Sequence, residues 1–474
     1  MRNFAKSILQ NYLNQLITEM TSLTMLIVAV FVIGYFFIAI ESVTKVNKAA
    51  IALLMFVCCW TIFMFDPTQY PAIAEIVDGK LNTVSQVVNG VIEHHLGSTA
   101  TTLFFLMGAM TIVELVDQNG GFNFVRDTLK THSKKALLWR IAFMTFILSA
   151  ILDNLTTSIV MIMILRKLVT DHKDRIIYAA LVVIAANSGG AFSPIGDVTT
   201  IMLWNKGVIT AGGVIKEILI PSIVSMVLPA WILSMSLKGE LVVPEMKGGE
   251  LGSSDFTAVQ RKVVFFLGVG GLIFVPVFKS ITHLPPFVGI LLILGLLWTV
   301  TEVFYSKLPK TANKTTMQKR VSNMLSRIDM STILFFLGIL MAVACLETIG
   351  VLTSLGNGLN VVFNGNHYLV TGIIGVLSSI VDNVPLVAGC MGMYPVDPGI
   401  GGDMSVDGIF WQLLAYCAGV GGSMLIIGSA AGVVVMGLEK ITFGWYMKKV
   451  SWIAFVGYLA GIIVYLVEKS VIGL

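Results

Sequence analysis

Apolar runs of about 18–25 residues recur along almost the whole chain, and each is long enough to cross about 30 Å of hydrocarbon. Only 12% of the 474 residues are charged, whereas soluble domains have about a quarter. The runs are also too long for the short alternating strands of an outer-membrane barrel. The sequence therefore predicts an all-α polytopic membrane protein whose main partner is the lipid bilayer. Its net charge of +4 is modest, and no nucleic-acid partner is predicted.

The apolar runs differ in length, and several are interrupted by Gly, Pro or polar residues. The first 20 residues precede these runs and have apolar side chains at helical spacing, which predicts a short interfacial helix. The predicted full or partial spans are 21–41, 49–65, 98–117, 136–152, 155–168, 177–204 with a break, 215–236, 262–279, 286–304, 330–348, 367–381, 385–394, 410–437 with a break, and 444–467.

Several short segments of the first half return about 230 residues later, in the same order. Because the pairs stay in register, the chain is predicted to contain two homologous halves. The matching pairs are Cys59–Ile62 with Leu297–Val300, Thr102–Gly108 with Ile333–Gly338, Glu114 with Glu347, Leu148–Asn154 with Leu377–Asn383, and, more weakly, Gly189–Asp197 with Gly421–Ser429.

Loop charges predict that the two halves face opposite ways. Segment 66–97 is acidic, whereas its counterpart 305–329 is rich in Lys and Arg; segment 118–135 is basic, whereas its counterpart 349–366 has no charged residue. Excess Lys and Arg marks cytoplasmic loops, so equivalent loops are expected on opposite sides of the membrane. Inverted repeats with broken helices are typical of secondary transporters.

These repeats predict a division of the chain into two halves, each with a scaffold part and a transport part. The predicted segments are an N-terminal interfacial segment 1–20, a first repeat 21–236 with scaffold helices 21–65 and a transport part 98–236, an inter-repeat loop 237–261, and a second repeat 262–474 with scaffold helices 262–304 and a transport part 330–474.

Each predicted transport part contains a re-entrant helical hairpin. Basic residues flank 136–168 on both sides, so this segment is expected to enter and leave on the cytoplasmic face, with Asp153 and Asn154 at its tip. The second hairpin is expected to enter from outside, with Asp382 and Asn383 at its tip. The alternative is that 136–152 crosses the membrane completely, since its 17 residues just suffice.

Each half also contains a broken transmembrane helix, at 187–200 and at 419–429, where Gly and Pro permit non-helical backbone. Such breaks are tolerated at membrane depth only where they face protein, water or a ligand. The first break carries Asp197, which could cap the following half-helix and also serve as an oxygen ligand. The second break has Gly and Ser but no acid.

Carboxylates, amides, hydroxyls and free carbonyls are hard oxygen ligands that suit Na⁺ better than zinc or copper. The predicted Na⁺ ligands are Asp153, Asn154, Asp382 and Asn383. Burial favours the protonated form of a carboxyl group and a nearby cation favours the ionised form, so Na⁺ and H⁺ would compete for it. The alternative interpretation is that these residues only cap helices and satisfy one another's hydrogen bonds.

Two further acids, Glu114 and Glu347, are predicted near the ends of equivalent helices. They are interpreted either as gate or proton-pathway residues or as interfacial residues that reach the headgroups. The sequence has no nucleophile–base pair, no phosphate-binding GxxxxGK[ST] loop and no HExxH. Neither an enzyme with catalytic residues, nor an ATP-driven pump, nor a cofactor is predicted.

Three segments, SAILDNLTTSIVMIMILRKLV, ANSGGAFSPIGDVTTIMLW and SSIVDNVPLVAG, resemble the NhaD-type sodium/proton antiporters of the ion transporter superfamily. This resemblance covers most of the chain from about residue 20. It implies a homodimer in the bacterial inner membrane that exchanges Na⁺ or Li⁺ for H⁺. The polar motif residues that it implies for ion and proton binding are Asp153, Asn154, Thr156, Thr157, Asn187, Ser188, Asp197, Thr199, Thr200, Ser378, Asp382, Asn383, Ser423 and Ser429.

Other carriers share this architecture, so the fold alone does not select the substrate. The main alternative is a Na⁺-coupled symporter of a dicarboxylate or oxyanion, or an arsenite-type exporter of the same superfamily. A channel-like or purely structural membrane protein agrees poorly with the broken repeats.

Overall fold

The structure is a computed structural model of the chain. The predicted interfacial helix 1–20, and residues 238 and 241–255 of the predicted inter-repeat loop 237–261, lie outside the residues that it describes. These residues are almost entirely helical and include no β-strand, only one isolated bridge between Ser133 and Glu240. The described residues are 21–39, 41–70, 73, 83–121, 129, 131–237, 239–240, 256–307, 325, 328–380, 382–397, 399 and 401–472.

Seven of the described helices are long and apolar enough to cross a membrane, by length and composition. The prediction of an all-α polytopic membrane protein is therefore confirmed. The elements are α2 Ser22–Ala39, α3 Glu41–Thr44, α4 Lys48–Phe63, η1 Pro67–Gln69, α6 Val84–Gln118, α8 Lys134–Leu152, α9 Asn154–Leu168, α10 His172–Ala191, α11 Val198–Lys206, α12 Ala211–Ser236, α13 Ala258–Thr282, α14 Pro286–Ser306, α17 Met330–Thr348, α18 Val351–Val362, α19 His367–Leu377, α20 Asn383–Met393, α21 Ile409–Gly421, α22 Ala430–Glu439, α23 Phe443–Lys449 and α24 Ser451–Ile472.

Three predicted boundaries are wrong. Helix α6 begins at Val84, inside the predicted external loop. Helix α18 occupies most of the uncharged segment 349–366, which was predicted as a loop, and its Gly and Asn residues have weak helix propensity. It packs on α17, and this tertiary contact outweighs its weak helix propensity. The predicted span 444–467 is divided at Val450 into α23 and α24.

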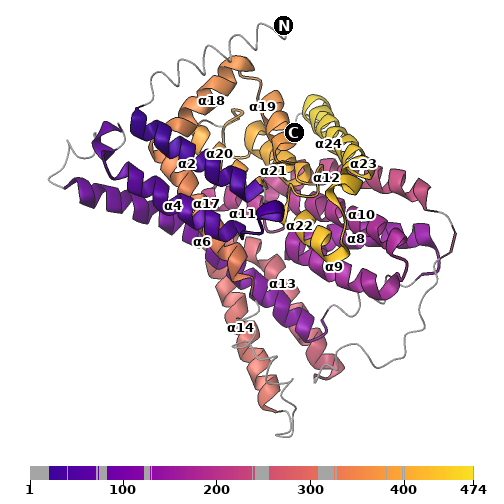
Figure 1. Cartoon of the computed structure of the whole chain (residues 1–474). Helices are drawn as coiled ribbons and strands as arrows, with labels where there is room; N and C mark the ends of the chain where they lie inside the picture. The colour runs from indigo at the N-terminus through magenta and orange to yellow at the C-terminus, as the bar shows by residue number, and fades with distance from the viewer. Residues whose placement is uncertain are drawn as a thin grey trace. The chain divides into compact units, whose positions relative to one another are not determined.

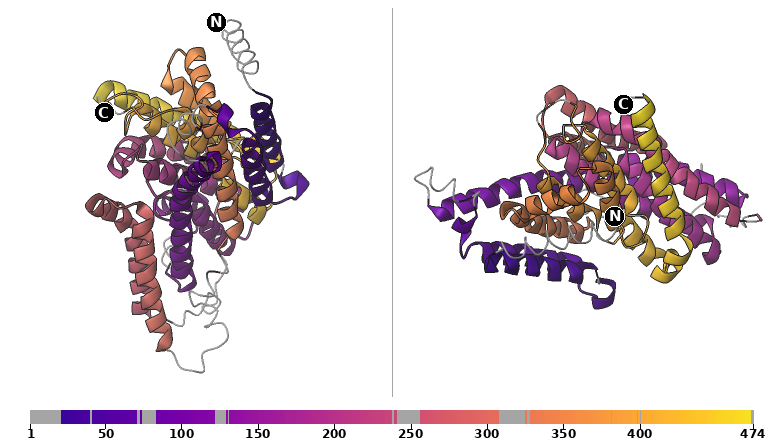
Figure 2. Two further views of the ribbon diagram at one scale, coloured as in Figure 1. Left: turned by 90° about the vertical axis from the view of Figure 1, so that its left-hand side faces the viewer. Right: turned by 90° about the horizontal axis from the view of Figure 1, so that it is seen from above.

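The chain forms two compact units. Unit 1 comprises Met1–Leu103, Asp329–Ile373 and Val384–Phe410. Its described core is built from α2, α4 and α17, and α2 and α4 run side by side as the dark indigo pair in Figure 2. The indole Nε1 of Trp60 donates a hydrogen bond to the carbonyl oxygen of Met341 at 2.8 Å and so ties α4 to α17.

Unit 2 comprises Phe104–Ile328, Ile374–Asn383 and Trp411–Leu474. Helix α10 lies at its centre and packs against α8, α9, α12 and α22 (Figure 1). Its residues from Tyr178 to Ala191 are all buried, because a helix that is apolar all round needs partners on every side. In the same unit α12 packs on α24 and α13 on α14.

The two compact units divide the chain differently from the predicted repeats, and the repeat division stays a prediction. Helices α13 and α14, predicted as scaffold, belong to unit 2, and α17, predicted as part of the transport region, belongs to unit 1. The inverted orientation of the halves depends on a membrane and on loops outside the described residues. It therefore stays a prediction.

Candidate ion-binding site

The first hairpin has its tip at the predicted position. Helix α8 ends at Leu152 and α9 begins at Asn154, and the two helices pack against each other. Asp153 lies between them with φ +78° and ψ 158°, and its carboxylate caps α9. It accepts hydrogen bonds from the backbone N–H of Thr156 at 2.8 Å and from the Thr156 hydroxyl at 2.9 Å. Asp153 is thus buried, and its carboxylate is hydrogen-bonded to the first turn of α9.

Both ends of this hairpin are attached to the first turns of α10. Lys134, at the start of α8, forms a 2.6 Å ion pair with Asp174 and accepts a hydrogen bond from the Tyr178 hydroxyl on its carbonyl oxygen. At the other end, Arg175 donates to the carbonyl oxygen of Val169 at 3.0 Å. Both ends of the hairpin therefore lie near the same end of α10. The 19 residues of α8 are long enough to cross a membrane, so the alternative of a complete span stays open.

The first broken helix is formed by α10 and α11, which are separated by residues 192–197. Asp197 has extended backbone and caps α11 by accepting the N–H of Thr199 at 2.9 Å and its hydroxyl at 2.8 Å. The Thr200 hydroxyl donates to the Asp197 carbonyl oxygen. Gly189 is required because a Cβ there would lie 2.2 Å from the carbonyl oxygen of Phe146 on α8.

Asp197 is the carboxylate on which the tips of both predicted hairpins converge. Its side chain is buried, with Asp197 only 1% exposed. The Asn154 amide donates to its Oδ2 at 2.5 Å, and the Asn383 amide lies 3.4 Å from both of its oxygens. The amide of Asn154 also donates to the side-chain oxygen of Asn187 at 3.1 Å. The two Asn side chains that the repeats had paired therefore meet at an acid of the broken helix.

Asn187 connects this group to the second broken helix, formed by α21 and α22. Its amide donates to the hydroxyl oxygens of Ser423 at 2.9 Å and Ser429 at 3.0 Å. All of these side chains are buried. Together they form the polar cluster, which consists of Asn154, Asn187, Asp197, Asn383, Ser423 and Ser429.

The surroundings of the two breaks repeat the same contacts. The Ser149 hydroxyl donates to the Ala186 carbonyl oxygen at 2.6 Å, and the Ser378 hydroxyl donates to that of Ala418 at 2.8 Å. Ser429 caps α22 with nearly the same φ and ψ as Asp197 at the start of α11. The second break thus has a hydroxyl where the first has a carboxylate, as the sequence indicated.

Two further carboxylates act on Asp197 through space. Asp153 and Asp382 each interact electrostatically with it. Three neighbouring carboxylates in a buried region repel one another when ionised, unless a cation or a proton compensates the charge. Besides the carboxylate of Asp197, the polar cluster contributes amides and hydroxyls, and it contains no Lys, Arg or His. The arrangement is suited to binding a small cation or protons.

The other predicted site residues have different positions. Thr157 is buried, and its hydroxyl has no hydrogen-bond partner among the described residues. Ser188 accepts a hydrogen bond from Ser225 at 2.9 Å. Glu114, in unit 2, accepts from the Gln118 amide at 3.0 Å, whereas Glu347 belongs to unit 1. These two glutamates lie outside the polar cluster, and their predicted roles stay predictions.

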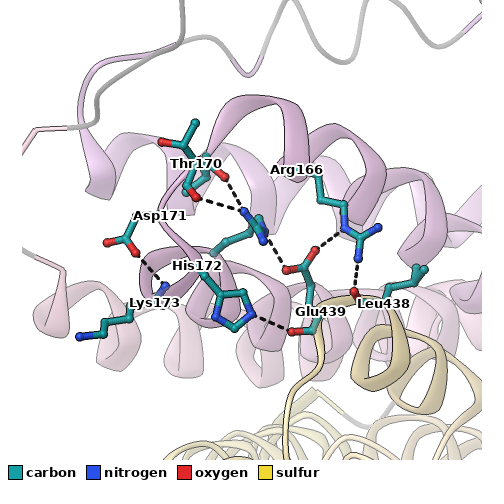
Figure 3. A network of polar contacts seen from close by, with 9 residues as sticks. Arg166, Thr170, Asp171, His172, Lys173, Leu438 and Glu439 are labelled. Carbon is teal, nitrogen blue, oxygen red and sulfur yellow. Dashed lines mark hydrogen bonds and ion pairs between the residues drawn. The ribbon is translucent and has the colours of Figure 1, made fainter.

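A second buried charged group was not predicted from the sequence. Glu439, at the end of α22, has a fully buried side chain and forms ion pairs with Arg166 and Arg175 (Figure 3). The available signal was a single acid directly after the apolar run GVVVMGL, at the end of a broken helix. The two arginines had been interpreted only as markers of the cytoplasmic side.

Comparison with known families places this site in context. A family model described as "Citrate transporter" matches residues 35–414. The chain is 45% identical over 437 residues to sodium/proton antiporter 1 of Arabidopsis thaliana, which covers 92% of this chain and 71% of that protein. It is 30% identical over 468 residues to the Na⁺/H⁺ antiporter NhaD of Alkalimonas amylolytica, with 93% and 89% covered. Its identity to NhaD of Vibrio parahaemolyticus is 32% over 402 residues, with 78% and 91% covered. The chain therefore belongs to the NhaD-type sodium/proton antiporters, a family of multi-pass membrane transporters.

Proposed function

We propose that the protein is a secondary active transporter that exchanges Na⁺ or Li⁺ for H⁺ by alternating access, with Asp197 at the centre of its ion site. The main observation in support is that this buried carboxylate accepts hydrogen bonds from the side-chain amides of Asn154 and Asn383. The names of the relatives support the same exchange. Neither these relatives nor the sequence motifs indicate an enzyme or a cofactor, and Na⁺ and H⁺ are the transported ions.

In the proposed mechanism, Na⁺ and H⁺ compete for the same carboxylates. The amide of Asn154 now donates its N–H to Asp197; a half-turn of the amide presents its oxygen to a bound Na⁺ instead. The hydroxyl oxygens of Thr199, Ser423 and Ser429 add hard ligands nearby. Protonation of the carboxylate removes its charge, which releases the cation. Alternating exposure of the site to the two sides then gives exchange.

The proposal also assigns Asp153 and Asp382 as Na⁺ ligands, together with Asn154 and Asn383, as predicted from the sequence. Their electrostatic interaction with Asp197 supports such a role, because binding a proton at one acid eases ionisation of the others. Asp153 is engaged by Thr156, so we assign it first to proton binding and second to direct contact with Na⁺.

The proposal also includes two inverted repeats with re-entrant hairpins, a homodimer and a bacterial inner membrane. The equivalent contacts of Ser149 and Ser378 support the repeats. The bacterial relatives named NhaD support the location, although two plant relatives match at higher identity. The homodimer follows from the family resemblance alone. Light scattering of the purified protein in detergent tests it, and a monomeric mass would contradict it.

The exchange itself is tested in proteoliposomes that contain a pH-sensitive dye. With a proton gradient imposed, NaCl is expected to dissipate the gradient, whereas choline chloride is not. Asp197→Asn should remove this response while inserting normally, because it keeps the size and the capping ability of the side chain but not its charge.

The second candidate is the alternative predicted from the sequence, a Na⁺-coupled symporter of a dicarboxylate or oxyanion or an arsenite-type exporter. The description of the family model, "Citrate transporter", favours a carrier of carboxylates within this alternative. The same vesicles separate the two functions. If Na⁺ has no effect alone while citrate, a dicarboxylate or arsenite produces Na⁺- or H⁺-linked flux, the antiporter proposal fails.

A further inference from the structure

A second buried polar group lies at the far end of α22 from the polar cluster. Glu439 is in the last turn of this helix, and its side chain is 0% exposed. Its Oε1 is 2.8 Å from Nε of Arg166 on α9, and its Oε2 is 2.7 Å from Nε of Arg175 on α10 (Figure 3). One carboxylate thus joins three helices. We call these three residues the clasp.

The two arginines of the clasp, together with His172, also donate hydrogen bonds to carbonyl oxygens at the nearby helix ends. Arg166 donates to the carbonyl oxygen of Leu438, and His172 Nε2 donates to that of Glu439 at 2.9 Å. Arg175 donates to the carbonyl oxygen of Val169, just after α9. The last carbonyls of a helix have no partner within it, and an acid there is opposed by the helix dipole. The arginines supply both the missing donors and the opposite charge.

The three clasped helices lead directly to the polar cluster. Helices α9, α10 and α22 all pack against one another. Helix α22, with 10 residues, is about 15 Å long. Each helix has a clasp residue toward one end and a polar-cluster residue toward the other: Arg166 and Asn154 on α9, Arg175 and Asn187 on α10, and Glu439 and the N-cap Ser429 on α22.

We propose that the clasp is a positioning device for the ion site, an inference that rests on the proposed Na⁺/H⁺ exchange. It fixes the axial register of α9, α10 and α22. This register sets how far Asn154 lies from Asn187, and Asn187 from Ser429. The clasp touches no transported ion. It acts through the helices, and its loss loosens the arrangement of ligands that must close around Na⁺.

The test compares Glu439→Gln with the wild-type protein in the dye-loaded proteoliposomes. Glutamine keeps the shape of the side chain but leaves both arginines without their counter-charge. The expected result is an increase of about tenfold in the KM for Na⁺, since a small misplacement of ligands costs that much or more. A second readout is the NaCl concentration that gives half-maximal protection against heat unfolding, which should rise by a similar factor.

Glu217→Gln is the matched control. Glu217 also forms an ion pair, with Lys469 at 2.9 Å, and accepts a hydrogen bond from the Tyr465 hydroxyl. These contacts join α12 to α24, and neither helix carries a residue of the clasp. The KM of the Glu217→Gln variant for Na⁺ should stay within about twofold of the wild-type value. If Glu439→Gln does not fold, Arg166→Gln replaces it. The Arg166 side chain is 44% exposed, and Glu439 then keeps Arg175.

The outcomes are distinct. A purely structural role would lower the yield or the unfolding temperature of the clasp variant but leave the KM and the NaCl midpoint of the folded protein unchanged, and that result overturns the inference. An equal increase in the KM of Glu217→Gln also overturns it. If the wild-type protein shows no Na⁺-dependent exchange, the proposed function itself fails.

Discussion

At the scale of single residues, Asp153 combines a local and a collective role. Its carboxylate caps α9, and its backbone has φ +78°, a conformation that strains any residue other than glycine by about 1–3 kcal/mol. The same carboxylate interacts electrostatically with Asp197. Capping alone would be served as well by Asn or Ser, neither of which brings a second charge into a buried region. The choice of Asp therefore supports the proposed role of this residue in ion or proton binding.

Substitutions at Asp153 separate the two roles. Asp153→Asn keeps a good helix cap but removes the charge, so we expect exchange to fall by about tenfold or more with little change in unfolding temperature. Asp153→Ala should lose exchange and also about 1 kcal/mol of stability, because the cap disappears. Proteoliposome exchange and thermal unfolding in detergent measure the two effects. Near-normal exchange by Asp153→Asn would leave this residue with capping only.

At the scale of helices, close backbone contact holds each broken helix against the first helix of a predicted hairpin. Gly189 of α10 lies against the Phe146 carbonyl of α8, and Gly421 of α21 lies against the carbonyl of Gly375. A Cβ at these two positions would be 2.2 Å and 2.1 Å from the respective oxygens. Glycine is therefore selected by the packing of two helices, in the same way in both halves.

Gly189→Ala is expected to destabilise the protein by about 1–3 kcal/mol, because a backbone carbonyl cannot move aside as a flexible side chain can. It should also lower exchange, since it pushes α10 and its Asn187 away from the hairpin. Gly212→Ala is the control, because a Cβ there meets nothing within 4 Å. Thermal unfolding followed by size-exclusion chromatography measures the difference. Equal stability of the two variants would contradict the packing explanation.

At the scale of the whole molecule, the proposed function depends on competition between two cations for one set of interacting acids. Asp153, Asp197 and Asp382 come from both halves of the sequence and from two kinds of helix break. In the proposed mechanism, an elevated proton concentration fills these acids and excludes Na⁺, whereas a high Na⁺ concentration displaces the protons. Because either ion would occupy the same site, the proposal has the two ions move in opposite directions when the exposure of the site alternates.

This competition predicts a specific pH dependence of transport. As the pH on the Na⁺-binding side falls, more of the free site is protonated, so the apparent KM for Na⁺ should rise by up to about tenfold per pH unit and per competing proton. The maximal rate at saturating Na⁺ should change little when the pH on that side is varied. Initial rates of dye response at several pH values and NaCl concentrations measure both quantities. A KM that is independent of pH would exclude a shared site.

The sequence by itself determined the class of protein and most of the spans, because apolar length and polar interruptions are local properties of the chain. It also paired Asn154 with Asn383, because matching short segments recur in the same order in the two halves of the sequence. Only the tertiary structure decided that both amides meet at Asp197, and that Glu439 joins α9, α10 and α22. These contacts bring together residues tens to hundreds of positions apart. Their partners depend on how helices pack and which buried polar groups must be satisfied, and no local pattern contains that information.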